Sequence, residues 1–164
     1  MYQKILVAVD QSEISPYVFE QGVFLAKAAD AELMLLHILS PLEDPYISPI
    51  FTQPDTIYPS VPTTPMNTYI QEWEEIKKQR LDWLRGLSET AINAGVKSGF
   101  TQSLGDAGKI ICEVARNSLT DLIVVGRRGR TGISEFLLGS VSNYVLHHAP
   151  CSILIVQGRL GNRE

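Results

Sequence analysis

The chain has 164 residues, of which 45% are hydrophobic, so it can form one sizeable hydrophobic core but not two. Its formal charge of -4, from 14 basic and 18 acidic residues, excludes the overall basic field that favours DNA or RNA as a partner. Cys112 and Cys151 are too few for a secreted disulfide framework, and no apolar run is long enough to span a membrane, so we expect one soluble, cytoplasmic domain over residues 1–164.

The first thirty residues predict a strand followed by a helix. Residues 4–9, KILVAV, form an apolar run rich in β-branched side chains, which is typical of a strand buried on both faces. Asp10 ends this run, Ser12 stands where a helix N-cap is expected, and Pro16 falls in the first turn. Apolar and small residues then follow at helical spacing as far as Ala29.

The same alternation continues to the end of the chain. Further strands are predicted at 32–39, 97–102, 121–125 and 151–156, and helices at about 71–94, 106–118 and 140–148. Because parallel strands need long crossovers and helices supply them, the sequence predicts an α/β fold with an open, five-stranded, mainly parallel sheet and helices on both faces.

A proline-rich insertion at 40–68 interrupts this regularity. It holds seven of the nine prolines of the chain, each of which removes a backbone donor and restricts the preceding residue. A mobile loop without regular structure is the preferred interpretation. The alternative is a lid, because the segment leaves a strand at the sheet edge where ligands of open α/β folds bind.

Residues 126–140, GRRGRTGISEFLLGS, predict a phosphate site between a buried strand and a helix. Gly126 and Gly129 would let the backbone approach a ligand closely. Gly139, followed by Ser140, Val141 and Ser142, would present the free N–H groups of the next helix to an anion. Arg127 and the two nearby arginines would either add positive potential or be solvated loop charges.

Two other phosphate motifs are excluded. GDAGKI at 105–110 resembles the end of a P-loop but has no Ser or Thr after Lys109, so a turn with Asp106 as helix N-cap is the better interpretation. No GxGxxG follows the first strand, which excludes the dinucleotide fingerprint of NAD and FAD proteins.

The motifs VxVDxS at 7–12 and G-x2-G-x9-G-S at 126–140 together resemble the universal stress protein family, and specifically its nucleotide-binding branch. The similarity covers nearly the whole chain, including KILVAVDQS, LLHIL, GDAGKII and LLGSVSNYVLHHAPCSILIV. It implies a Rossmann-like sheet of strand order 3-2-1-4-5, a homodimer formed through the last strand at about 151–156, and the binding of ATP or another adenine nucleotide.

The resemblance also implies roles for single residues. Asp10 would lie near the ribose, with Ser12 of the same motif beside it, and the main chain at Ile38 would meet the adenine edge. Gly126 would approach the ribose, with Arg127 next to it. The phosphates would be bound by the remaining members of the glycine motif and the start of the last helix: Gly129, Gly139, Ser140, Val141 and Ser142.

These features predict a dimeric sensor of ATP, AMP or a cyclic adenine nucleotide that acts in a stress or signalling response, with an unidentified protein partner. No paired acid and base or activated nucleophile can be assembled, so we predict no catalytic residues. Asp10 alone offers too few ligands for a metal site, and any Mg²⁺ would be carried by the nucleotide. The alternative is a slow ATPase or nucleotide-dependent phosphotransfer protein, with Ser140 or another hydroxyl as acceptor. His37 is predicted to be a core or rim histidine.

Overall fold

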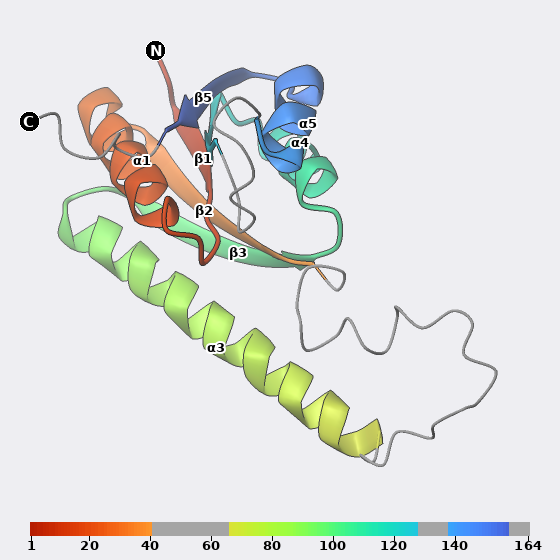
Figure 1. The fold of residues 1–164 in the computed structure, drawn as a ribbon. Helices are drawn as coiled ribbons and strands as arrows, with labels where there is room; N and C mark the ends of the chain where they lie inside the picture. Colours follow the sequence, from red (N-terminus) through yellow and green to blue (C-terminus); the bar gives the residue numbers. More distant parts are fainter. Residues whose placement is uncertain (41–65, 128–137, 158–164) are drawn as a thin grey trace, which may run out of the picture.

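The computed structural model describes residues 1–40, 66–127 and 138–157. Its centre is a five-stranded, entirely parallel sheet of order β3-β2-β1-β4-β5 (Figure 1). The strands are β1 (Lys4–Ala8), β2 (Glu32–Leu39), β3 (Ser98–Leu104), β4 (Leu122–Gly126) and β5 (Ser152–Val156). The predicted fold class and strand order are therefore confirmed.

In the described parts of the chain, four helices cover the two faces of this sheet (Figure 1). α1 (Ser15–Ala29) and α3 (Met66–Asn93) pack on one face, whereas α4 (Ala107–Asn117) and α5 (Ser140–His148) pack on the other. Side chains alternate between the two faces along each strand, so Leu33 and Leu35 belong to the α1/α3 core and Leu36 belongs to the α4/α5 core. The sheet is consequently buried on both sides, as the apolar strand sequences predict.

Two glycines allow helices to approach their neighbours closely. A Cβ on Gly22 of α1 would collide with Val7 of β1, and a Cβ on Gly108 of α4 would lie 2.8 Å from the ring of Tyr144 in α5. Gly108 belongs to the GDAGKI segment, where Asp106 accepts a hydrogen bond from the Lys109 amide at 3.0 Å. The prediction that this segment is a turn with Asp106 as helix N-cap is therefore confirmed. Its glycine lies at a contact between two helices.

Two predicted helix starts differ from the structure. α1 begins at Ser15, its N-cap position is occupied by Ile14 without a side-chain cap, and the predicted cap Ser12 instead hydrogen bonds to Asp10. α3 begins at Met66, so residues 66–68 of the predicted insertion are helical. Pro65, the last proline of the insertion, directly precedes this helix, and nothing after it obstructs helical hydrogen bonding.

α3 is the longest helix, with 28 residues, and it extends past the end of the sheet (Figure 1). Its C-terminal half packs on the sheet through Leu84 and Ala91, both completely buried, while Ile70 near its start is 53% exposed. No helix in the described parts of the chain is long and apolar enough to cross a membrane.

Candidate functional site

At the carboxyl edge of the sheet, β1 ends earlier than its two neighbours, β2 and β4. The pairing of β1 with β2 ends at Ala8 and Leu36, and its pairing with β4 ends at Val7 and Val124. β2 continues to Leu39 with β3 as its partner, and β4 continues with β5. Among the described residues, the main chain of β2 and β4 therefore has no strand partner on the β1 side beyond these points, apart from the Leu36 carbonyl, which accepts from the Val9 amide.

Asp10 stands in the turn that follows β1, and hydrogen bonds fix this turn. The Asp10 carboxylate accepts two bonds at Oδ1, from the Ser12 amide at 3.0 Å and from the Ser12 hydroxyl at 2.5 Å. The Asp10 amide donates to the buried Ser15 hydroxyl at 3.1 Å. Among the described residues no donor reaches Oδ2, so this oxygen can accept hydrogen bonds from a ligand.

His37 connects the same turn to β2. Its side chain is 2% exposed, and Nδ1 lies 2.9 Å from the carbonyl oxygen of Val9, the residue before Asp10. A carbonyl oxygen can only accept, so Nδ1 carries the hydrogen. On its other side the imidazole meets the indole of Trp83 from α3 edge to face, with ring centroids 5.4 Å apart. The prediction of a buried histidine is confirmed, but the sequence did not predict its link to the Asp10 turn, nor the role of Ser15.

The first turn of α5 is fastened to the end of β4. The Ser142 hydroxyl donates to the Gly126 carbonyl at 2.5 Å, and the Gly139 amide donates to the Arg127 carbonyl at 2.9 Å. Arg127 in turn donates its amide to Val156 of β5 at 2.7 Å. The Gly139 amide and the Ser142 hydroxyl are therefore engaged within the protein.

The amides of Ser140, Val141 and Ser142 occupy the first three positions of α5, which have no intrahelical acceptor. Gly139 precedes them with extended backbone, φ -60° and ψ 154°, and its carbonyl accepts from the Asn143 amide at 2.9 Å. An N-terminus of this kind carries about half a positive charge, so it favours an anion.

The predicted site residues come from three strands and one helix. Parallel strands place the ends of β1, β2 and β4 at one edge, and so bring Asp10, Ser12, Ile38, Gly126 and Arg127 to the same side of the sheet as the start of α5. Ile38 is half-buried against the α4/α5 core and lies in the part of β2 beyond the end of β1. Gly129, with Arg128 and Arg130, lies outside the described residues, as does the predicted lid over most of its length.

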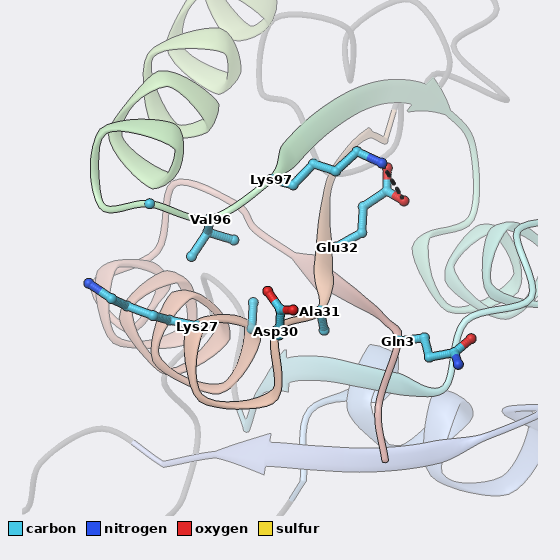
Figure 2. A pocket seen from close by; sticks show the side chains of 9 residues that line it. Gln3, Lys27, Asp30, Ala31, Glu32, Val96 and Lys97 are labelled. Atoms are coloured by element: carbon cyan, nitrogen blue, oxygen red, sulfur yellow. Dashed lines mark ion pairs between the residues drawn. The ribbon is translucent and has the colours of Figure 1, made fainter.

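A cavity of about 300 Å³ lies at the opposite, amino edge of the sheet (Figure 2). Glu32 and Lys97 point toward each other there and form an ion pair at 3.6 Å, while Lys27 points away from them. The Lys97 side chain is 80% exposed, so this pair is well solvated. The cavity is separated from the Asp10 turn by the length of the strands.

Three side chains outside the site have displaced pKa values. The amides of Gln3 and Lys4 both donate to Asp121 Oδ2 at 2.8 Å, and these bonds lower the pKa of the Asp121 carboxyl. Burial raises the pKa of the Cys112 thiol and also that of Cys151, where the charge of Asp121 adds to the effect. Both thiols therefore resist ionisation. In the described parts of the chain, no three His, Cys, Asp or Glu residues gather as a metal site.

Comparisons with known proteins agree on one family. The model of the universal stress protein family matches residues 1–157. The chain is 36% identical to universal stress protein Sll1388 of Synechocystis over 160 residues, which cover 95% of this chain and 98% of that protein.

Solved structures agree in fold. Universal stress protein UspA from Lactobacillus plantarum has a TM-score of 0.71 at 22% identity, covering 94% of this chain and 97% of its own. A universal stress protein in complex with cAMP has a TM-score of 0.61 at 24% identity, covering 95% and 97%. A universal stress protein family protein from Arabidopsis thaliana with AMP bound has a TM-score of 0.61 at 20% identity, covering 99% and 96%.

Proposed function

Because the chain belongs to the universal stress protein family, we propose that it binds an adenine nucleotide at the carboxyl edge of the sheet, between the Asp10 turn and the first turn of α5. The observation that carries this proposal is the early end of β1, beyond which the main chain of β2 and β4 has no β1 partner. The structures of similar fold with cAMP and AMP support the choice of ligand.

Each part of the site suits one part of a nucleotide. Asp10 Oδ2 would accept hydrogen bonds from ribose hydroxyls, while its other oxygen stays bound to Ser12. The main chain at Ile38 would meet the polar edge of adenine, since β2 has no β1 partner at this level. The amides of Ser140 and Val141, with that of Ser142, would bind phosphate oxygens.

The magnitudes are adequate for micromolar binding. Hydrogen bonds to charged groups contribute about 1.5–3 kcal/mol each, and a micromolar dissociation constant corresponds to about 8 kcal/mol. Three amide contacts at the start of α5 together with Asp10 therefore approach the required free energy. Titration calorimetry with ATP and with AMP tests the proposal, and no binding of either nucleotide up to about millimolar concentration would refute it.

Two substitutions at Ser140 isolate the role of the helix N-terminus. Ser140→Pro removes one amide donor, yet proline is favoured at the first position of a helix and the extended backbone of Gly139 is compatible with a following proline. Ser140→Ala keeps the amide and removes only the hydroxyl. We expect the proline variant to bind ATP about tenfold more weakly and the alanine variant to bind like the unmodified protein.

Both variants lack the Ser140 hydroxyl, so an equal loss of binding in the two would implicate this hydroxyl and favour the alternative of phosphotransfer to it. Phosphotransfer predicts that the unmodified protein incorporates phosphate from radiolabelled ATP and that Ser140→Ala does not. The proposed binding function predicts no incorporation in either of these two proteins. Far-ultraviolet circular dichroism of both variants controls for loss of α5.

We further propose that the nucleotide acts as a signal in a dimer formed through β5. β5 is an edge strand that pairs only with β4 among the described strands, and its apolar residues Ile153 to Ile155 are half-buried. Pairing with a second copy would satisfy its outer backbone groups. Light scattering after size-exclusion chromatography should give the mass of a dimer at micromolar concentration, and a monomer would contradict this part of the proposal.

A further inference from the structure

We propose that His37 is a positioning residue for the nucleotide site, which holds the Asp10 turn at the end of β1 through its Nδ1–H bond to the Val9 carbonyl. The inference rests on the proposed nucleotide binding and assigns a specific task to a side chain outside the ligand contacts. His37 lies on the α1/α3 side of β2, where Leu33 and Leu35 precede it at alternate positions.

The Val9 carbonyl lies where the pairing of β1 with β2 ends. The Val9 amide still donates to Leu36 at 2.9 Å, and the Val9 carbonyl is then bound by the His37 side chain rather than by strand main chain. Asp10 follows directly. The peptide between Val9 and Asp10 is therefore held at both of its polar groups, by the imidazole N–H at the Val9 carbonyl and by the Ser15 hydroxyl at the Asp10 amide.

The imidazole is itself fixed in place. It is 2% exposed, and the indole of Trp83 packs against it at an interplanar angle of 81°. Because the imidazole is already packed in place, it loses little conformational freedom when it binds the carbonyl, so the entropic cost of the bond is small. The bond also requires that Nδ1 carries the hydrogen, which defines the tautomer of His37.

Without this donor the Val9 carbonyl would be left in a buried site without a hydrogen bond, and it would turn toward solvent. That rotation would move the Asp10 amide away from Ser15 and displace the carboxylate that is proposed to receive the ribose. Binding would weaken although no ligand contact has been removed.

Two substitutions separate positioning from packing. His37→Leu keeps most of the side-chain volume against Trp83 and removes the donor. His37→Asn places an amide nitrogen where Nδ1 stands but leaves space beside Trp83. We expect His37→Leu to weaken ATP binding about tenfold and His37→Asn to weaken it less than about threefold. The loss of packing against Trp83 is larger in His37→Asn, so a weaker affinity of His37→Leu would not follow from packing.

A second measurement reports on the turn without nucleotide. The Ser12 amide donates to Asp10 Oδ1, so its hydrogen exchange, followed by NMR, reports whether the turn is ordered. We expect exchange about tenfold faster in His37→Leu and close to the original rate in His37→Asn. Nitrogen-15 NMR of the unmodified protein should show the Nδ1-protonated tautomer.

The inference is overturned if His37→Leu has the same ATP affinity and the same Ser12 exchange rate as the unmodified protein. It is also overturned if His37→Leu and His37→Asn lose the same amount of affinity. If the unmodified protein binds neither ATP nor AMP, the proposed function fails. The Ser12 exchange rates then still decide whether His37 positions the turn.

Discussion

The Ser142 hydroxyl donates to the Gly126 carbonyl at 2.5 Å and so joins the first turn of α5 to the last residue of β4. Ser142 is 3% exposed, so this hydroxyl faces the protein and only its amide remains for a ligand. Two residues predicted to contact different parts of one nucleotide therefore first stabilise each other. The start of α5 is fixed before any ligand arrives.

Removing this bond should lower stability. We expect Ser142→Ala to reduce the free energy of unfolding by about 0.5–1.5 kcal/mol, because the half-buried Gly126 carbonyl loses a donor. Denaturation in urea, followed by circular dichroism, measures the change. The exposed Ser140 provides the matched control, and Ser140→Ala should stay within about 0.5 kcal/mol of the unmodified protein. Equal stability of the two variants would contradict the structural role of Ser142.

The contact between α4 and α5 depends on the absence of a side chain at Gly108. Gly108→Ala should cost about 1–3 kcal/mol, because the new Cβ would lie 2.8 Å from the ring of Tyr144. Gly86 in α3 is the control, since a Cβ there meets nothing within 4 Å. Gly86→Ala should stabilise the protein by up to about 1 kcal/mol.

The cost of Gly108→Ala should shrink when it is measured in a Tyr144→Ala background, since the ring is then gone. An undiminished cost would show that the helix contact is not its cause.

Asp121 should make stability depend on pH in the acid range. Its carboxyl has a pKa below the ordinary 3.8, because the amides of Gln3 and Lys4 bind the charged form. A group whose pKa is lowered on folding contributes stability above its unfolded pKa, and this contribution is lost as the pH falls through the folded value. Asp121→Asn should therefore be less stable than the unmodified protein at neutral pH, and the two should converge below about pH 3.8.

Urea denaturation at a series of pH values measures this convergence. Glu72→Gln, which removes a carboxylate from an exposed position of α3, is the control for a change in net charge alone. A stability difference for Asp121→Asn that persists unchanged into acid would refute the role of the charged carboxylate.

The two thiols should react slowly in the folded protein. Burial raises the pKa of both Cys112 and Cys151, so the reactive thiolate is scarce at about pH 8. We expect alkylation by iodoacetamide to be slower than for a cysteine peptide and to reach the peptide rate after unfolding in guanidinium chloride. Single serine variants assign the two rates, and peptide-like reactivity of Cys112 in the folded state would contradict its 4% exposure.

Strands were predictable where local sequence and burial agree. The runs at the first strand and at DLIVV are apolar throughout because both sheet faces are covered, and the strands were found within one or two residues. The polar third strand was also predicted, although its position at the sheet edge leaves it only half-buried. The order of the strands came from the family resemblance and not from the apolar pattern.

Other features depend on particular side-chain contacts, some of them between residues that are distant in sequence. Ser12 is a residue type favoured at helix N-caps, but its hydroxyl binds Asp10, two residues earlier, and the helix starts three residues later. The pairing of Gly108 with Tyr144 spans two helices, and the bond from His37 to Val9 joins β2 to the residue after β1, 28 positions earlier in the chain. No local pattern contains these last two contacts, so only the folded arrangement reveals them.

The sheet is assembled from two parts of the chain that meet along a single pair of strands. β1, β2 and β3 lie within residues 4–104, whereas β4 and β5 follow residue 121, and β1 and β4 pair over three residues from Ile5 and Leu122 to Val7 and Val124. Asp10 belongs to the first part and Gly126 to the second. A ligand that contacts both would hold the two parts together, and its binding would raise the free energy needed to separate the N-terminal from the C-terminal part of the sheet.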